Sequence, residues 1–303
     1  MTQTLKTTLD QFFHDPNIRF ASAHTLRAYK LDLNDFLKHI VEERANKVTE
    51  EDLFEEVVNC TTVDLNSYKF YLGESKAATI ARKFATLRKF LNWAHKKELR
   101  RKALPDFPKI RTEQKLAPKW LTKSQVDALL RKAEKRDHCT CKRNLVLIKL
   151  MLHTGLRVSE AVSLTWDEIT IKRYDGILNV IGGKGKKDRV VPLNSTIRTV
   201  LSEYKESMIK MGYEKDSYLF YGGRGKLKPD AVLRVFYSLN KELDFKVTPH
   251  NLRHTFCKNL LNKEVPLNEI SDLAGHSSLD ITQRYITASL GDLAKSVEKI
   301  NEI

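Results

Sequence analysis

Hydrophobic residues recur at helical spacing through most of the first hundred residues. One stripe repeats at steps of three and four: Leu26, Tyr29, Leu33, Phe36, Leu37 and Ile40. A second stripe lies between residues 76 and 98: Ile80, Phe84, Leu87, Leu91 and Ala94. Such steps place side chains on one face of a helix, and Ser22 is a suitable N-cap for the first. The first half of the chain is therefore predicted to be entirely helical.

The second half mixes two periodicities. Residues 123–135 and 143–153 have helical spacing, and Gly155 suits the left-handed C-cap of the second segment. Two β-branched runs, residues 177–181 and 190–193, flank the sequence GGKGKKDR and predict a β-hairpin with a basic, glycine-rich loop. Helical patterns return from about residue 228 to the C-terminus.

The two halves meet in a proline-containing segment. Residues 104–119 read LPDFPKIRTEQKLAPK, with little apolar periodicity, and proline interrupts regular structure. We therefore predict a helical domain over residues 1–104, a linker over 105–119 and a second domain over 120–303. The expected fold class is mainly α, with an N-terminal helical bundle and a C-terminal α+β domain that holds a small antiparallel sheet.

Charge narrows the function. The 303 residues include 53 Lys+Arg and 38 Asp+Glu, a net charge of +15, with 41% hydrophobic residues. This composition suits a globular protein rather than a disordered one, and the excess positive charge favours a polyanion as the binding partner, either nucleic acid or an acidic membrane surface.

Four cysteines at uneven spacing favour free thiols in a reducing compartment. The sequence has neither an apolar run of about 18 residues nor a secretion signal, so a cytoplasmic location without membrane partners is expected.

The segment over residues 76–98 also carries a face of a single charge sign: Arg82, Lys83, Arg88, Lys89, Lys96 and Lys97. Two interpretations are open, a solvated charged face and a surface that contacts phosphates.

Four segments of the second half place cations, imidazoles or hydroxyls at organised positions. In TGLRVSE, Arg157 follows the predicted helix end at Gly155, and Glu160 lies three residues further on, where it could orient the guanidinium. A structural Arg–Glu pair is the alternative. The hairpin loop matches neither a P-loop nor a dinucleotide fingerprint, and a solvated basic turn is its alternative.

The third and fourth segments are TPHNLRH and LAGHSSLDITQRY. Thr248 and Pro249 predict a helix start, and His250 and Arg253 then share a face near the positive end of that helix. His254 is expected to point elsewhere, in a core or capping role. His276 precedes a predicted serine-capped helix, and Tyr285 by itself would be read as a packing residue.

The sequence gives little support for metal or cofactor chemistry. His138, Cys139 and Cys141 have no second pair at ligand spacing, and these motifs lack the acidic cluster of a two-metal nuclease. No cofactor and no metal are expected.

TGLRVSE, GGKGKKDR, HNLRH and LAGHSSLDITQRY together resemble, in order, the active-site motifs of the tyrosine recombinase (phage integrase) family, especially its short Xer-like members. SAHTLRAYKLDLNDFLKHI is similar to the start of the family's SAM-like core-binding domain, which clamps DNA. The resemblance implies a metal- and ATP-independent enzyme of DNA recombination and integration.

The resemblance also implies roles for six residues. Arg157, Arg253 and His276 would stabilise the scissile phosphate, and Tyr285 would attack it to form a 3′-phosphotyrosyl link. His250 would accept or orient a proton, because imidazole titrates near neutrality. Lys184 would protonate the leaving 5′-oxygen, with Lys186 and Lys187 as alternatives for this general acid.

Partners follow from the same resemblance: double-stranded DNA recombination sites, and a homo-tetramer on two sites. An apolar stripe after Tyr285 predicts an amphipathic helix that would dock on a neighbouring protomer: Leu290, Leu293, Val297 and Ile300. Packing on its own domain is the alternative, and a second recombinase or an accessory protein is a further partner. Other functions compatible with the sequence are type IB topoisomerase-like relaxation and catalytically silent architectural DNA binding.

Overall fold

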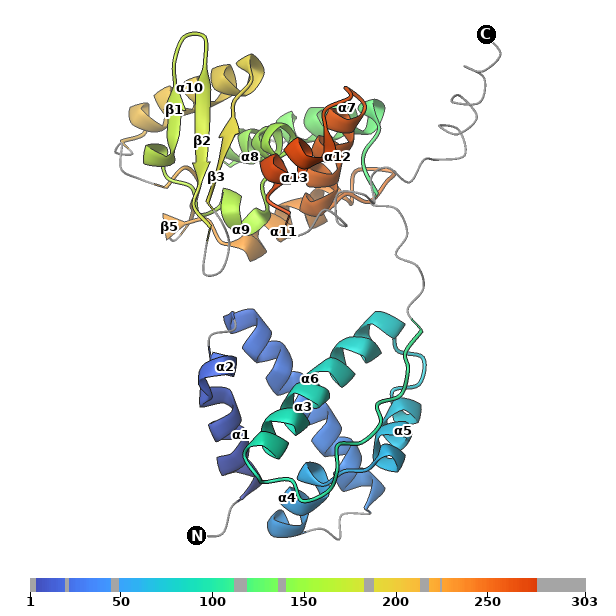
Figure 1. Ribbon diagram of the computed structural model, residues 1–303. Helices are drawn as coiled ribbons and strands as arrows, with labels where there is room; N and C mark the ends of the chain where they lie inside the picture. Colours follow the sequence, from blue (N-terminus) through green and yellow to red (C-terminus); the bar gives the residue numbers. More distant parts are fainter. Residues whose placement is uncertain are drawn as a thin grey trace. The chain divides into compact units, whose positions relative to one another are not determined.

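The computed structural model describes residues 4–19, 22–44, 49–111, 119–135, 140–182, 188–212, 218–223 and 225–276 (Figure 1). The chain divides into two compact units, Met1–Lys115 and Leu116–Ile303. The first is helical, and the second combines helices with small antiparallel sheets. No helix in the described ranges has the length and hydropathy needed to cross a bilayer.

Six helices make up the described part of the helical unit: α1 (Leu5–His14), α2 (Pro16–Arg19), α3 (Ala23–Glu43), α4 (Glu50–Val58), α5 (Thr62–Tyr71) and α6 (Ala77–Lys96). Local sequence signals explain several of their starts. The Ser22 side chain accepts a hydrogen bond from the Thr25 amide, as predicted for the cap of α3. Thr61 and Asp64 form a capping box at α5.

The core of the helical unit lies between α3, α5 and α6. Phe36, Tyr68 and Leu87 are fully buried in it, and each buried apolar side chain of this size contributes about 1.5–3 kcal/mol. In Figure 1, α3 and α6 cross each other, and the two helices are in contact. The predicted apolar stripes of both helices therefore face each other across this core.

Acidic residues of α3 engage part of the basic face predicted on α6. Arg82 forms an ion pair with Asp32, which is 1% exposed and also accepts a hydrogen bond from Thr86. Lys83 forms an ion pair with Asp35, whose carboxylate also accepts from the Tyr68 hydroxyl at 2.7 Å.

These ion pairs engage two of the six cations that the sequence places on this face. Lys89 lies over the ring of Tyr29 at 5.4 Å. Arg82 and Lys83 join α6 to α3, and the Arg82 side chain is still 48% exposed, so contact of this face with phosphates stays a prediction.

The proline-containing segment begins against the helical unit. Phe107 packs edge-on to Phe84 and lies 4.6 Å below the Arg88 guanidinium, and Ile110 packs on the same core. The Asp106 amide also donates to Thr62 Oγ1 at 3.0 Å. Residues 105–111, at the start of the predicted linker, are thus anchored to the helical unit.

The described part of the second unit contains the following elements: α7 (Lys123–Glu134), α8 (Cys141–Thr154), α9 (Val158–Ala161), η1 (Trp166–Glu168), β1 (Ile169–Ile171), β2 (Gly176–Val180), β3 (Arg189–Pro192), α10 (Ser195–Lys210), β4 (Tyr221–Gly222), β5 (Gly225–Lys226), α11 (Pro229–Leu239), α12 (Pro249–Leu261) and α13 (Leu267–Ala274). The two predicted hairpin strands and the helices predicted within the described residues are present, whereas the helices predicted after His276 lie outside the described residues. The short strands β1, β4 and β5 were not predicted, because two or three residues show no readable alternation.

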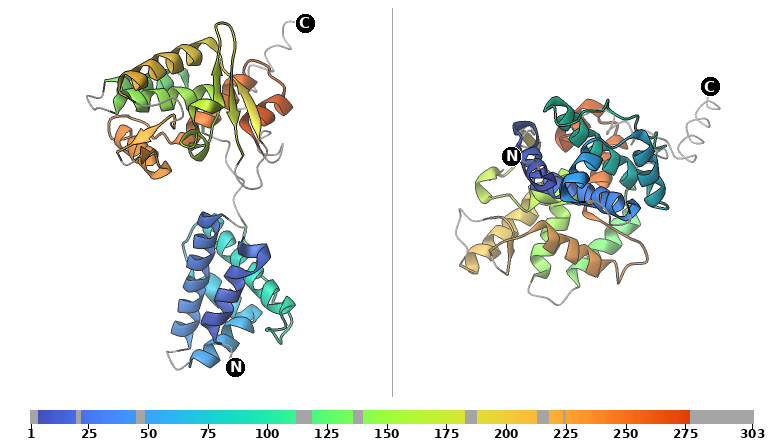
Figure 2. Two further views of the ribbon diagram at one scale, coloured as in Figure 1. Left: turned by 90° about the vertical axis from the view of Figure 1, so that its left-hand side faces the viewer. Right: turned by 90° about the horizontal axis from the view of Figure 1, so that it is seen from below.

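The main sheet has the order β1-β2-β3, with both pairs antiparallel. Asn179 pairs with Val190 and Val180 with Arg189, so the predicted hairpin is in register up to its loop. In the left view of Figure 2, α13 lies beside β3, and the two elements are in contact. The β-hairpin is therefore packed directly against α13.

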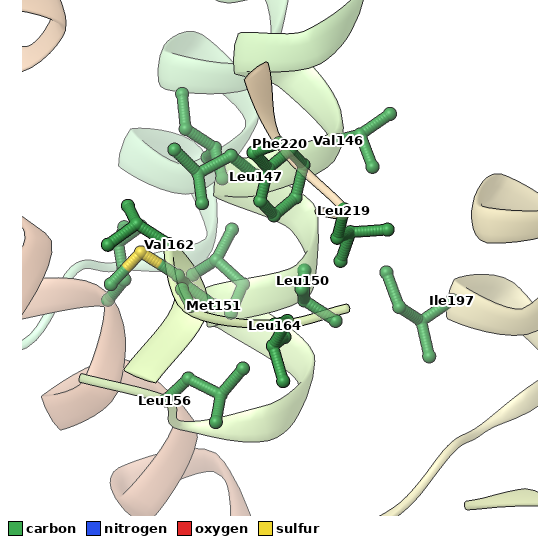
Figure 3. Close-up of a cluster of buried hydrophobic side chains, with 14 of the residues drawn as sticks. Val146, Leu147, Leu150, Met151, Leu156, Val162, Leu164, Ile197, Leu219 and Phe220 are labelled. Atoms are coloured by element: carbon green, nitrogen blue, oxygen red, sulfur yellow. The ribbon is translucent and has the colours of Figure 1, made fainter. Parts of the chain in front are cut away.

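Helix α8 forms the centre of the core of this unit. Its side chains pack against residues that lie between α10 and β4 (Figure 3): Val146, Leu147, Leu150 and Met151 with Leu219 and Phe220. Leu150, Leu219 and Phe220 are fully buried. Helices α7, α10 and α12 surround α8, so the end of α8 is held in a rigid setting.

Candidate active site

The end of α8 makes a sharp corner. Gly155 has φ +64° and ψ 18°, the left-handed conformation predicted for this C-cap. A Cβ at this position would lie 2.4 Å from Cδ1 of Phe256 on α12, so α8 and α12 approach each other closely here. The chain enters α9 two residues later, with Arg157 as its N-cap residue.

Two contacts hold the Arg157 guanidinium at this corner. Its Nη1 donates to Glu160 Oε1 at 2.8 Å, and its Nη2 donates to the carbonyl oxygen of Gly275 at 2.7 Å. The side chain keeps 30% of its surface exposed. The predicted hydrogen bond between Arg157 and Glu160 is present, and it is compatible with both the orienting role and the structural pair.

The Glu160 carboxylate is anionic and buried, with an exposed side-chain fraction of 8%. Burial would raise its pKa, but hydrogen bonds from the Arg189 side chain and the Arg157 amide lower the pKa of Glu160 to about 2. It therefore remains charged throughout the neutral range.

Arg253 is a buried guanidinium with spare hydrogen-bonding capacity. The residue is 2% exposed, and its Nη1 donates to the Gly155 carbonyl at 2.7 Å. Its Nη2 is buried and has no hydrogen-bond partner within the described ranges. Burial and then the charge of Arg157 lower the pKa of Arg253 to about 10, so it is still protonated near neutrality. A buried donor without a partner is costly, and an anionic ligand would satisfy it.

Three imidazoles lie near the two guanidiniums. The rings of His250 and His254 on α12 meet edge to face, with centroids 4.2 Å apart. Burial and the nearby charges of Arg253 and Arg157 lower the pKa of His250, and they lower that of His276 to about 3. Each imidazole is therefore neutral near pH 7 without an anion.

The helix that carries His250 and Arg253 starts at a well-defined point. Thr248 and Asn251 form a capping box, and Pro249 is the first helical residue, as predicted. The Asn251 side-chain amide also donates to the carbonyl of Lys119 at 2.6 Å, and Thr255 Oγ1 accepts from the Leu121 amide at 2.9 Å. The first residues of the second unit thus fix the position of α12.

The arrangement can bind and polarise a phosphodiester. Two guanidiniums and three imidazoles come together from the corner after α8, from α12 and from the end of α13. Guanidiniums pair with phosphate oxygens through charge-assisted hydrogen bonds and stabilise the charge that grows on them during phosphoryl transfer.

Comparison with known proteins agrees with this chemistry. Residues 119–290 match the model of the phage integrase family, and residues 9–98 match its N-terminal SAM-like domain. The chain belongs to the phage integrase family. It is a tyrosine recombinase, an enzyme that cleaves and rejoins DNA strands.

Curated relatives of this tyrosine recombinase share its length. A tyrosine recombinase of Pseudothermotoga lettingae is 30% identical over 295 residues, covering 94% of both chains. The tyrosine recombinase XerD of Proteus mirabilis is 34% identical over 275 residues, covering 87% of this chain and 82% of its own. The predicted family and its Xer-like character are confirmed.

Solved structures share the fold. The XerH site-specific recombinase bound to palindromic difH substrate, in a post-cleavage complex, superposes with a TM-score of 0.73 at 22% identity and covers 92% of this chain and 81% of its own. A lambda integrase dimer bound to a COC′ core site gives 0.69 at 20% identity, with 93% and 95% covered. The predicted fold class is confirmed.

The structure brings four of the six predicted site residues of this tyrosine recombinase together: Arg157, His250, Arg253 and His276. Lys184 and Tyr285 lie outside the described residues, as do the alternatives Lys186 and Lys187 and the predicted C-terminal helix. Within the described ranges, no group of three His, Cys, Asp or Glu side chains could hold a metal ion.

The prediction for His254 was wrong. It does not point away from the site, because residues four apart on a helix share a face and its ring therefore meets that of His250. Burial, His250 and Arg253 lower the pKa of His254 to about 4.

Sequence reasoning also missed Arg189, which contacts Glu160. Alternation along β3 was the available signal, because it places Arg189 on the same face as buried Val191.

Proposed function

We propose that this recombinase performs site-specific strand exchange through a covalent 3′-phosphotyrosyl intermediate. The observation that carries the proposal is the buried Nη2 of Arg253, which has no hydrogen-bond partner among the described residues and lies near Arg157 and the imidazoles of the site. Such a group is complementary to a singly charged phosphodiester rather than to a neutral substrate. Its residues come from segments that match the order of the family's motifs.

Binding and charge stabilisation fall to Arg157, Arg253 and His276. In the pentacoordinate transition state negative charge grows on the two non-bridging oxygens, and fixed donors there contribute the largest share of catalysis. Arg253 has an Nη2 donor available for one of these oxygens. Arg157 is held at Glu160 and Gly275, so its position costs little further ordering when DNA binds.

Tyr285 is the proposed nucleophile. A free phenol has a pKa near 10, so attack at neutral pH requires that its proton is transferred. His250 is proposed to accept or orient that proton, because its lowered pKa keeps the imidazole in the basic form. The Tyr285 oxygen then forms a bond to phosphorus while the bond from phosphorus to the 5′-oxygen breaks.

The leaving 5′-oxygen needs a proton, and Lys184 is proposed to donate it. Lys186 and Lys187 are the alternatives in the same loop. The product is a 3′-phosphotyrosyl enzyme and a free 5′-hydroxyl. In the reverse direction, a 5′-hydroxyl of the exchanged strand attacks the phosphotyrosine and releases Tyr285, so the phosphoester bond is conserved and no ATP is consumed.

The proposed partners are two double-stranded recombination sites and further copies of this chain. The XerH and lambda integrase structures hold their own DNA sites, the latter as a dimer. We propose a tetramer on two sites, joined through the amphipathic segment after Tyr285, with a second recombinase or an accessory protein as a further partner. A cytoplasmic location follows from a chromosomal or plasmid DNA substrate.

Recovery of the cleaved DNA tests this proposal. The protein is expressed in a bacterial host, covalent protein–DNA adducts are isolated under denaturing conditions, and the attached DNA is sequenced. Recovery of one recurrent duplex sequence, attached through its 3′ phosphate, supports site-specific recombination. Attachment to unrelated sequences, with relaxation of any supercoiled plasmid by the monomer, supports a type IB topoisomerase instead. If no adduct forms, even with nicked duplexes carrying candidate sites, the protein is a catalytically silent DNA-binding protein.

A further inference from the structure

Glu160 is shared between two arginines. Its Oε1 accepts from Arg157 Nη1 at 2.8 Å, and its Oε2 accepts from the Arg157 amide at 2.8 Å. On its other side, Arg189 donates from Nη2 to Oε2 at 2.8 Å and from Nη1 to Oε1 at 3.3 Å. Arg189 thus forms the fork-to-fork pair with the carboxylate, while Arg157 gives it one guanidinium hydrogen bond.

Arg189 is held on its remaining side by the end of α13. Its Nε donates to the carbonyl oxygen of Leu273 at 3.0 Å, and its side chain is 10% exposed. Gly275 lies against the same guanidinium, and a Cβ there would be 2.7 Å from Arg189 Nη1. Each of the three guanidinium nitrogens of Arg189 therefore donates to a protein partner.

The charges of this group favour a specific role. Arg157, Glu160 and Arg189 together carry a net charge of +1, and Glu160 is buried between the two cations. Without Arg189, the carboxylate would neutralise Arg157 and compete with the phosphate for its guanidinium. A buried carboxylate that loses one of two cationic partners has only the other cation left to offset its charge.

We propose that Arg189 is a positioning residue that acts as the counterion of Glu160 and so keeps the charge of Arg157 available to the scissile phosphate. The inference rests on the proposed phosphoryl transfer at Arg157. It assigns Arg189 an electrostatic effect on a step in which it touches no reacting atom. The same contacts join the first residue of β3 to the corner after α8 and to the end of α13.

The test compares cleavage rates on two versions of a suicide duplex that carries a site to which the wild-type protein attaches. One has the natural scissile phosphate, and the other has a methylphosphonate there, which removes one negative charge from the linkage. R189M should slow covalent attachment to the phosphate by about 10-fold or more, as for a lost charge-stabilising donor. On the methylphosphonate, R189M should slow attachment by only about 3-fold or less, because cleavage of a neutral linkage depends less on the charge of Arg157.

A double variant makes the test independent of a simple structural defect. E160Q combined with R189M restores the net charge of +1 and removes the carboxylate that would otherwise neutralise Arg157, so it should recover most of the rate lost in R189M. R198M is the matched control and should keep the wild-type rate. It also removes a half-buried arginine, whose Nη1 donates to the Leu193 carbonyl. Circular dichroism and thermal melting establish that each variant is folded.

The outcomes separate this inference from the proposed function. If the wild type forms no adduct with any duplex, the proposed function fails. Suppose instead that the wild type reacts, that R189M slows attachment by the same factor on both substrates, and that the double variant is as slow as R189M. Arg189 is then merely structural and the inference is overturned. If R189M does not fold, the double variant and R189K carry the same comparison. Failure of all three to fold assigns Arg189 to stability alone and also overturns the inference.

Discussion

Arg253 donates from Nη1 to the carbonyl oxygen of Gly155 at 2.7 Å, although 98 residues separate them. This hydrogen bond joins α12 to the left-handed cap of α8 and leaves the second terminal nitrogen of Arg253 without a partner in the described part of the chain. The same cap carries the chain to Arg157. One backbone corner thus sets the positions of both guanidiniums proposed to hold the phosphate.

Gly155→Ala tests this corner. The substitution forces a side chain into a left-handed conformation and a Cβ into the Phe256 ring, and it should lower the free energy of unfolding by roughly 2–4 kcal/mol. Gly212→Ala is the control, because φ is +82° there but no atom lies within 4 Å of the added Cβ. It should cost only about 1 kcal/mol. Equal losses in urea unfolding of the two variants would contradict close packing at Gly155.

Tyr285→Phe should abolish covalent attachment, by roughly 10³-fold or more, because no other hydroxyl replaces the nucleophile. Affinity for the duplex should stay within about 2-fold, since phosphate contacts dominate affinity. Denaturing gels measure the adduct and mobility shifts measure binding. Tyr174→Phe, at an 80% exposed tyrosine, is the control for the loss of one phenol hydroxyl. Collapse of DNA binding in Tyr285→Phe would make Tyr285 a structural residue.

Arg157→Ala should slow cleavage by about 10²–10³-fold while weakening DNA binding much less, because the guanidinium acts mainly on charge that develops in the transition state. Arg157→Lys retains the charge but not the planar fork, so its rate should lie between those of the wild type and Arg157→Ala. Single-turnover cleavage with saturating enzyme separates the two effects. Equal losses in binding and cleavage would reduce Arg157 to an ordinary phosphate contact.

The stability of the DNA-free protein should fall in mild acid. His254 and His276 have pKa values lowered to about 4 and about 3, against 6.5 for a free imidazole. Above pH 6.5 both imidazoles are neutral in the folded and the unfolded chain, and their titration costs no stability. As the pH falls from 6.5 toward the folded-state pKa values, the unfolded chain binds more protons than the folded one, so the free energy of unfolding falls. Melting temperatures measured across this range should show the decline, and His276→Asn should flatten it. An unchanged slope in His276→Asn would contradict the assignment.

Truncation after Ala288 removes the amphipathic C-terminal segment, and it should impair synapsis of two sites and cleavage together. Leu293 lies on the predicted apolar stripe, so Leu293→Asp should reproduce the defect. Lys295 lies on the predicted opposite face, so Lys295→Ala should leave synapsis and cleavage unchanged. Native gel electrophoresis measures the synaptic complexes, and cleavage is measured on the same DNA. Full activity of the truncated protein would exclude docking on a neighbouring protomer.

The sequence by itself determined the features that depend on near neighbours. Apolar periodicity predicted α3, α6, α7 and α8, and capping residues predicted helix starts at Ser22 and Thr248. Gly155 was predictable as a left-handed cap because a local steric preference favours glycine there. The order of the four motifs indicated the family, since each motif is a short continuous segment.

Only the tertiary structure decided which side chains share a partner. Arg82 and Lys83 pair with Asp32 and Asp35 across two helices, and Arg189 shares Glu160 with Arg157 from another segment. A local sequence pattern gives the face on which a charge lies but not the distant residue that packs against it. These pairings depend on how α3 packs on α6, and how β3 and α13 pack beside the corner after α8, which is set by burial of the core.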